Sequence, residues 1–328
     1  MDTSQYARDN GYSAMKIGIM TGSGFDPSPT LAGMIENAKR IESLGFHSLW
    51  MATIYSYDAL TALAAIGPHT RHIELGTAVV ATHARHPMAM AQQALTVSAA
   101  CCGRFTLGIG LSHRYVIEQQ MGLSYEKPVM HMREYLQILR PLLQDKQVDV
   151  RGELFSTQVS LDISEAPTPQ LVIGALGPAM LTLTGEMADG TTLWLTGPKT
   201  IAQHTIPTIR AAADATGRKP PRIIAGMPVV LSDDEAEARR MVDRQLGLYK
   251  DIPSYRAMLD RENADGPGDV ALVGNKAQLH AQLNQLRAIG VTDLNAVLVN
   301  EDSSTYEATL GFLAQELEYF GRREDVTN

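Results

Sequence analysis

The sequence predicts an α/β fold, a (β/α)8 TIM barrel. From Lys16 onward, eight short apolar segments alternate with segments whose apolar residues recur at helical spacing. The apolar segments are continuous rather than alternating, which is typical of parallel strands that are covered on both faces. Eight such strand–helix units close a barrel. The rival architecture, a doubly wound open sheet, usually carries a glycine-rich fingerprint after its first strand, and Thr21–Phe25 lacks the third glycine.

The first four units show this alternation clearly. Leu31, Met34 and Ala38 recur at helical spacing in the first helical segment, and Gly45 ends it at the left-handed cap position. Pro87 lies in the first turn of the third helical segment, where proline is favoured. We predict strands at Lys16–Met20, Ser48–Met51, Ile73–Val80 and Phe105–Ile109, and helices at Leu31–Leu44, Ala59–Ile66, His86–Ala100 and Val129–Leu143.

An insertion separates the fourth and fifth units. Val148–Ile163 alternates apolar and polar residues around Gly152, which predicts a β-hairpin outside the barrel repeat. Residues 248–273 form a second, Pro/Gly-containing excursion. We predict the remaining strands at Leu171–Ala175, Thr191–Leu195, Ile223–Leu231 and Leu294–Val299, with helices at Pro178–Met187, Lys199–Thr216, Asp234–Leu246, Ala277–Ala288 and Tyr306–Phe320.

The chain is expected to form one domain over residues 15–328, with the insertion at about 146–170, after a disordered tail at 1–14. This tail lacks the apolar core of a signal peptide. A formal charge of −8 argues against nonspecific nucleic-acid binding and against an anionic membrane surface. The two cysteines, Cys101 and Cys102, are adjacent and predict no disulfide, which fits the cytoplasm. We find no metal-site spacing and expect no metal.

In a barrel, the active site lies at the C-terminal ends of the strands. There, Gly174 and Gly177 allow close approach and Pro178 begins a helix, whose free N–H groups suit a phosphate. Thr196–Lys199 adds a second turn of the same kind after the next strand. The alternative is that both are tight strand–helix turns without a ligand.

Three polar side chains near this predicted mouth are candidates for catalysis. His83 and His113 follow the third and fourth strands, and histidine is the natural acid or base near neutral pH. Tyr55 follows the second strand and has a hydroxyl to donate. The alternative is that each is an ordinary loop or surface residue.

Several motifs, in this order and spacing, resemble the luciferase-like flavin and deazaflavin oxidoreductases. The resemblance runs from about Lys16 to Gly321, and the segments around His113 and Thr196 are most similar to the branch that uses coenzyme F420, a deazaflavin. The FMN monooxygenases are the next most similar group. The motifs are Ile73–Val80, Arg85–Pro87, Gly103–Gly110, Gly177–Pro178, Ala188–Thr191 and Gly217–Arg222.

The resemblance implies where the cofactor would lie. A bulge with a non-prolyl cis peptide at Ala78–Val79 would back the reactive ring, and the loop after the fifth strand would approach the phosphate. His113 falls where some relatives place an acidic residue. The implied cofactor-binding residues are Thr53, Ala78, Val79, Gly110, His113, Gly174, Ala175, Leu176, Gly177 and Thr196.

One departure narrows the expected activity. Sugar-phosphate dehydrogenases of the F420 branch have an Asp-His pair where this chain has Thr53 and Ile54. We therefore expect an F420-dependent reductase that transfers a hydride between the deazaflavin and a small organic substrate. An FMN-dependent monooxygenase and a cofactor-binding protein with little catalysis are the alternatives. The resemblance also implies a homodimer, for which helix Met88–Ala100 is the expected interface.

Overall fold

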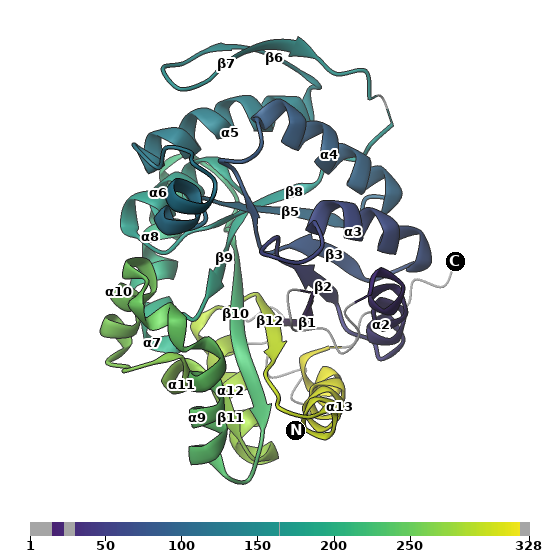
Figure 1. The fold of residues 1–328 in the computed structure, drawn as a ribbon, viewed down its shortest axis with the longest axis vertical. Coiled ribbons are helices and arrows are strands. Elements are labelled where there is room, and N and C mark those ends of the chain that lie inside the picture. The colour runs from purple at the N-terminus through teal and green to yellow at the C-terminus, as the bar shows by residue number, and fades with distance from the viewer. Residues whose placement is uncertain (1–14, 23–29, 164, 322–328) are drawn as a thin grey trace.

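The computed structural model describes residues 15–22, 30–163 and 165–321, so the predicted tail at 1–14 lies outside the described residues. Eight parallel strands form a closed barrel, because β10 pairs with both β12 and β9 and thereby joins the two ends of the sheet. Figure 1 looks along this barrel. The strands in barrel order are β1 (Lys16–Thr21), β2 (Ser48–Met51), β3 (Glu74–Thr77), β5 (Phe105–Gly110), β8 (Gln170–Gly174), β9 (Gly190–Trp194), β10 (Arg222–Leu231) and β12 (Asp293–Leu298).

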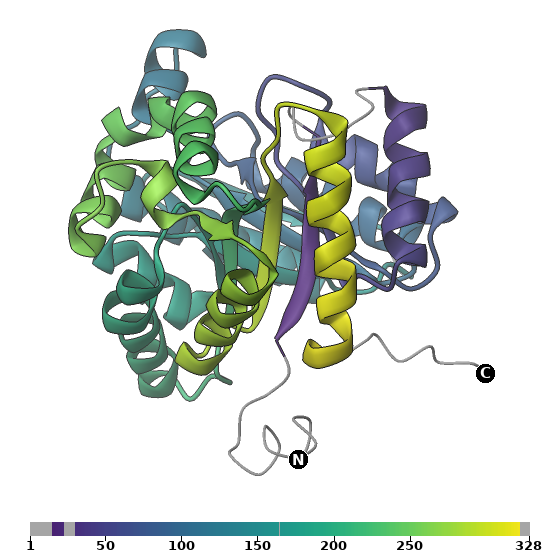
Figure 2. The ribbon, with the colours of Figure 1, turned by 90° about the horizontal axis from the view of Figure 1, so that it is seen from below.

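Helices surround the barrel, and their buried faces pack on the strands. Figure 2 shows α13 alongside β1, which joins the last helix to the first strand. Side-chain oxygens of Thr30, Asp58 and Asp302 cap the first turns of α2, α3 and α13. The helices are α2 (Leu31–Ser43), α3 (Ala59–Ile66), α4 (Pro87–Ala100), α5 (Pro128–Gln144), α6 (Pro178–Met187), α7 (Pro198–Thr200), α8 (Ile206–Ala215), α9 (Glu235–Leu246), α10 (Pro253–Glu262), α11 (Pro267–Val270), α12 (Lys276–Ile289) and α13 (Ser303–Phe320), with η1 (Gly67–His69), η2 (Val116–Gln120), η3 (Ile201–Thr205) and η4 (Gly247–Asp251).

The third strand differs from the expected continuous run over Ile73–Val80. It breaks into β3 and the short β4 (Val80–Ala81), and the peptide between Ala78 and Val79 is cis. At the break, the Thr77 hydroxyl donates to the Gly108 carbonyl at 2.8 Å and accepts the Gly108 N–H at 2.7 Å. The Thr77 side chain thus takes the place of backbone-to-backbone hydrogen bonds between the two strands. A pattern of apolar residues in the sequence does not reveal such a break.

The insertion forms the predicted hairpin. β6 (Gln147–Arg151) and β7 (Ser156–Ser160) pair antiparallel, and Figure 1 shows them outside α5. The buried Glu134 carboxylate on α5 accepts the backbone N–H groups of Glu153, Leu154 and Phe155 at 2.7–3.0 Å. Its carboxylate therefore fixes the tip of the hairpin to the barrel.

The excursion at 248–273 contains helices and a strand that were not assigned from the sequence. It contains η4, α10, α11 and the short strand β11 (Leu272–Gly274), which extends the sheet beside β10. Pro253 begins α10 and Asn263 ends it with a left-handed φ of 61°. These are two ordinary helix-boundary signals.

Trp50 is the largest side chain inside the barrel, and a cluster of charged side chains lies at the N-terminal end of the strands. Trp50 is fully buried, and a Cβ on Gly76 would lie 2.2 Å from its ring, so a larger residue there would displace Trp50. At the N-terminal end, Arg222 contacts Glu74 at 2.8 Å and Asp293 at 2.6 Å. The C-terminal ends of the strands lie at the opposite end, where barrel enzymes place their active sites.

Candidate functional site at the barrel mouth

The floor of the barrel mouth is the bulge between β3 and β4. The Ala78 N–H donates to the Met51 carbonyl at 2.9 Å, and the Val79 carbonyl accepts the Thr53 N–H at 3.1 Å, so the bulge is tied to β2. A Cβ on Gly110 would lie 2.8 Å from the Val79 side chain, and one on Gly174 would lie 3.4 Å from it. These two glycines therefore make room for the Val79 side chain. The Thr53 hydroxyl accepts the Ala59 N–H at 3.1 Å.

The loop after β8 presents an open helix start. Gly177 caps α6 in an extended conformation, and no side chain of the described residues accepts a hydrogen bond there. A Cβ on Gly177 would meet none of the described atoms within 4 Å, whereas Ala175 is buried. His204, on η3, contacts the Leu176 carbonyl through Nε2 at 2.9 Å and fixes the loop. Nothing in the sequence indicated this contact, because His204 lies 28 residues after Leu176 and within a helical segment.

The second predicted phosphate turn, Thr196–Lys199, is already filled by a side chain. The Glu262 carboxylate on α10 accepts the N–H groups of Lys199 at 3.1 Å and Thr200 at 2.8 Å. Thr196 is buried and its hydroxyl donates to the Trp194 carbonyl at 3.2 Å. The backbone N–H groups for which the sequence predicted a phosphate therefore donate to Glu262 of α10 instead.

Four rings from three parts of the chain form an inner aromatic cluster at the mouth: His113, Trp194, Tyr249 and Tyr255. The Tyr255 ring lies edge-on to His113 at 5.6 Å and to Tyr249 at 5.1 Å, and Tyr249 lies 5.9 Å from Trp194. η4 and α10 supply both tyrosines, which the sequence analysis missed because it assigned no helix to that excursion.

Burial keeps this cluster uncharged. Burial lowers the pKa of His113 and raises the pKa values of Tyr249 and Tyr255 from their ordinary values. The Trp194 side chain acts on the pKa of Tyr249 in the opposite direction. Burial therefore favours the neutral form of the His113 imidazole over the protonated form.

His83 lies in a separate cluster beside the mouth. Its ring stacks on His131 of α5 at 4.1 Å and on Tyr125 at 5.2 Å. Burial lowers the pKa of His83, against the effect of a backbone hydrogen bond at Leu111. These contacts give His83 a packing role, and its catalytic role stays a prediction.

His131 predicts acid sensitivity. Burial, and then the neighbouring His83, lower the pKa of His131 to about 4, while Glu134 acts in the opposite direction. The unfolded chain binds this proton below about pH 6.5, but the folded chain resists it until about pH 4. Stability is therefore full above pH 6.5, and up to about 3 kcal/mol is expected to be lost as the pH falls toward 4.

Urea unfolding of the wild type and His131→Gln between pH 7.5 and 4.5 measures this loss. The variant is expected to lose less stability across this range than the wild type. His72→Gln, which changes an exposed histidine, is the control and should keep the wild-type dependence. Parallel pH dependences for His131→Gln and wild type would show that His131 is not the cause.

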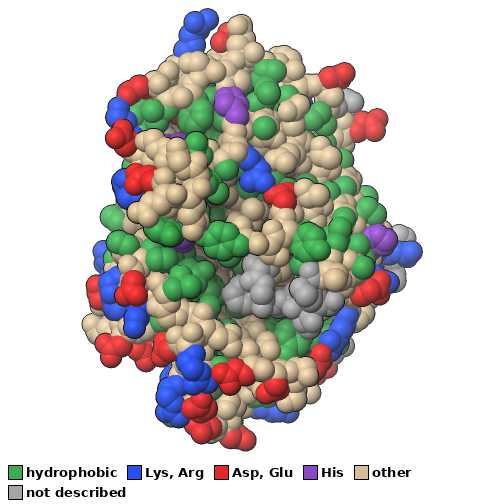
Figure 3. All heavy atoms as spheres, in the orientation of Figure 1, with side chains coloured by type: hydrophobic (Ala, Val, Ile, Leu, Met, Phe, Trp, Pro, Cys, Tyr) green, Lys and Arg blue, Asp and Glu red, His purple; other side chains and the backbone are tan. Residues whose placement is uncertain are grey.

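Tyr55 lies at the outer edge of the mouth. Its side chain is 75% exposed, and its hydroxyl donates to the Gln120 Oε1 at 2.6 Å. The bond links the loop after β2 to η2. Figure 3 shows hydrophobic side chains gathered about the centre of this face and most charged ones toward its edges.

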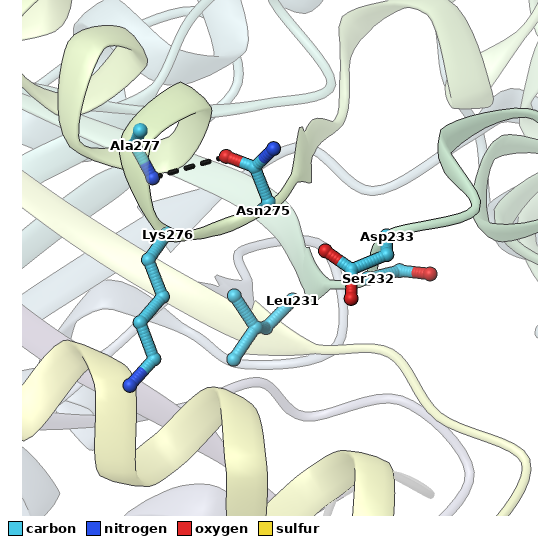
Figure 4. Close-up of a pocket in the computed structure, with 6 residues that line it drawn as sticks. All are labelled: Leu231, Ser232, Asp233, Asn275, Lys276 and Ala277. Atoms are coloured by element: carbon cyan, nitrogen blue, oxygen red, sulfur yellow. Dashed lines mark hydrogen bonds between the residues drawn. The ribbon is translucent and has the colours of Figure 1, made fainter.

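A surface hollow lies elsewhere, where β10 ends and α12 begins (Figure 4). Asn275 accepts the N–H groups of Ala277 and Gln278, each at 3.1 Å, so the helix start is already capped. Lys276 and Asp233 point in different directions. The charged side chains around the hollow therefore do not point toward a common ligand position. Its lining residues are Leu231, Ser232, Asp233, Asn275, Lys276 and Ala277.

No helix among the described residues is both long and apolar enough to span a membrane. In the same part of the chain, no three His, Cys, Asp or Glu side chains are grouped as metal ligands.

Sequence comparisons identify relatives over most of the chain. The sequence model of the luciferase-like monooxygenase family matches residues 15–293. A putative coenzyme F420-dependent oxidoreductase of Mycobacterium tuberculosis is 29% identical over 255 residues, which cover 72% of this chain and 73% of the relative. A 5,10-methylenetetrahydromethanopterin reductase of Methanolobus tindarius is 27% identical over 219 residues, which cover 66% of this chain and 67% of the relative.

Solved structures with the same fold include enzymes of two cofactor classes. An F420-dependent secondary alcohol dehydrogenase in complex with an F420–acetone adduct has a TM-score of 0.78 at 16% identity, covering 93% of this chain and 99% of the other. The oxygenating constituent of a Pseudomonas putida 3,6-diketocamphane monooxygenase, in complex with FMN, has a TM-score of 0.74 at 17% identity, covering 92% and 97%. Identities this low establish the shared barrel alone.

Proposed function

Because the chain belongs to the luciferase-like monooxygenase family, we propose that it is an F420-dependent oxidoreductase acting on a small organic substrate. In this proposal the enzyme works as a reductase, so a hydride passes from the reduced deazaflavin to the substrate. The names of two sequence relatives, an F420-dependent oxidoreductase and a methylenetetrahydromethanopterin reductase, support this choice.

The observation that carries the proposal is the pairing of the Val79 floor with the open start of α6. Val79 is a half-buried apolar side chain, against which a flat ring could pack. Gly177 leaves space beside helix amides that no side chain caps, as a phosphate requires. The residues present therefore fit the ring and the phosphate of F420, with Ala78 and Val79 at the ring and Gly174–Gly177 at the phosphate.

The remaining chemistry belongs to the side chains of the mouth. When bound, F420 supplies a ring carbon that carries the hydride. Trp194, Tyr249 and Tyr255 exclude water, because their rings pack over the end of β9. His113 holds a proton at an imidazole nitrogen and delivers it to the carbanion or enolate that hydride addition leaves on the substrate.

Binding of the two cofactors tests the proposal. In fluorescence titrations of the purified protein, F420 is expected to saturate and FMN to bind far more weakly. Tight FMN binding without F420 binding would favour the monooxygenase, a candidate that the FMN-bound structural neighbour supports at the level of fold. F420 binding without hydride exchange toward any of a panel of activated alkenes and carbonyls would favour a cofactor-binding protein.

His113→Ala is expected to lower turnover at least ~10-fold, the low edge of general acid catalysis. The pKa of His113 is lowered by burial, so its protonated fraction grows as the pH falls below about 6.5. Turnover of the wild type should therefore rise between pH 7.5 and 5.5, and the variant should lack this rise. Its Tm and F420 affinity should stay near wild type. Near-normal turnover in the variant would remove His113 from the mechanism and make Tyr55 or His83 the next candidate.

We also propose a homodimer, as the family resemblance implies. On the expected interface helix α4, the exposed residues include Gln92, Thr96 and Ala99. This exposed surface is small and polar in character and forms no large apolar patch among the described residues. Light scattering at micromolar concentration is expected to give two chain masses. A single chain mass would contradict this proposal without touching the cofactor assignment.

A further inference from the structure

Exposed apolar side chains are concentrated at the rim of the barrel mouth. Of the ten large hydrophobic side chains that are exposed in the described residues, six lie in two segments, 54–57 and 115–123. Both segments follow C-terminal ends of barrel strands, β2 and β5, and the Tyr55–Gln120 hydrogen bond joins them. We call these six side chains the apolar rim: Ile54, Tyr55, Tyr57, Tyr115, Met121 and Leu123.

The charged groups of these segments are already paired. Arg114 forms an ion pair with Glu118 and lies over the Tyr125 ring, 5.1 Å from its centroid. Asp58, just after the first segment, forms an ion pair with Arg85. A charged ligand would have to break one of these pairs or lose its own hydration without a partner, and both are costly.

The apolar surface continues from the rim into the mouth. Arg114 precedes Tyr115 of the rim and lies over the Tyr125 ring. The Tyr125 hydroxyl donates to the carbonyl of Ser112, which precedes His113 of the inner cluster, at 3.3 Å. The inner aromatic cluster is uncharged near neutral pH for the reasons given above. Aromatic side chains therefore occur both on the exposed rim and in the inner cluster around His113.

From this arrangement we propose that the substrate is an uncharged, largely apolar organic molecule with a flat ring, held between the apolar rim and the inner aromatic cluster. The proposal rests on the function proposed above and names the substrate class of the same site. Aromatic side chains contribute packing area and preferred ring–ring geometry to such a molecule, and they contribute little to a phosphate or carboxylate.

A matched pair of probes tests the substrate class. 2-Naphthol is uncharged at pH 7, and 2-naphthoate carries one negative charge on the same ring system. In equilibrium dialysis against F420-loaded protein, 2-naphthol is expected to bind at least tenfold more tightly than 2-naphthoate. Equal affinities, or tighter binding of 2-naphthoate, would overturn the proposal.

Rim variants localise the binding. The double variant Tyr115→Ser/Met121→Ser removes two exposed rim side chains and should weaken 2-naphthol binding at least tenfold. Tyr319→Ser is the matched control, because Tyr319 is 55% exposed on α13 and Tyr115 is 58% exposed on the rim. Equal 2-naphthol affinity in the rim variant and the control would reject the rim as its site. A rim variant that changes only the oligomeric state would reassign the rim to an interface between two copies.

The F420 affinity of each variant is measured separately, so that the two proposals fail independently. Normal F420 binding without any preference for 2-naphthol rejects the substrate class and leaves the function standing. Absence of F420 binding to the wild type rejects the function, and the dialysis is then repeated on the cofactor-free protein. A preference for 2-naphthol that depends on the rim in that protein still supports the ligand class.

Discussion

Arg222→Met is expected to destabilise the fold by about 3–5 kcal/mol, the usual cost of removing one partner from a buried ion pair. Burial disfavours the guanidinium charge, but Asp293 and Glu74 outweigh it and raise the pKa of Arg222 above its usual value. The Arg222 side chain also donates to Gln170 at 2.7 Å and lies 5.9 Å from the Trp50 ring. Its loss would remove the guanidinium that pairs with both Glu74 and Asp293, and would leave Glu74 with the more distant Lys16, at 3.9 Å, as its cationic partner among the described residues.

The measurement is urea unfolding at pH 7.5, with Arg133→Met as the matched control. Arg133 pairs with Glu186 at 2.9 Å on the surface, where an ion pair contributes about 0–1 kcal/mol. Restoring an uncharged end with Arg222→Met/Glu74→Leu/Asp293→Leu is expected to recover part of the lost stability, because no carboxylate then remains unpaired. If Arg222→Met is as stable as Arg133→Met, the prediction is wrong, and water replaces the hydrogen bonds that the Arg222 guanidinium makes to the two carboxylates.

The barrel could be predicted from the sequence because its signals are local. Each strand is a short apolar run, and helix caps such as Asp58 and Gly45 are visible as single residues. The division of the third strand was not visible, since it depends on a hydrogen bond from the Thr77 side chain to Gly108 on the neighbouring strand β5. Only a three-dimensional neighbour makes that glycine necessary: a Cβ on Gly108 would lie 1.8 Å from the Thr77 carbonyl oxygen.

The candidate site was predicted in outline and missed in detail for the same reason. Glycine and proline mark the turns at Gly177 and Gly197, and the family resemblance implies the bulge that the structure has at Ala78–Val79. No residue near Gly197 in the sequence indicates Glu262, which lies 65 residues later and accepts the N–H groups of Lys199 and Thr200. Pro253 and Asn263 bracket α10, and those two signals could have indicated the helix that carries Tyr255 and Glu262.

Gly177→Leu is expected to weaken F420 binding at least ~100-fold while leaving the fold intact. The backbone at Gly177 has φ −77° and ψ 154°, which any residue adopts, and an added Cβ meets no protein atom within 4 Å. The leucine side chain would instead fill the space that the phosphate needs beside α6. Losing two charge-assisted hydrogen bonds at about 1.5 kcal/mol each corresponds to that factor.

Gly311→Leu is the matched control for this effect. Gly311 lies on α13, and a Cβ there also meets nothing within 4 Å, so the two variants add the same atoms to open space. Both should unfold near the wild-type temperature, and only Gly177→Leu should lose F420 in a fluorescence titration. If both variants bind F420 like the wild type, the phosphate lies elsewhere, and the amides of Lys199 and Thr200 become the next candidate. Those amides are held by Glu262 in this structure, so binding there would require α10 to move, and Glu262→Gln would then tighten F420 binding rather than weaken it.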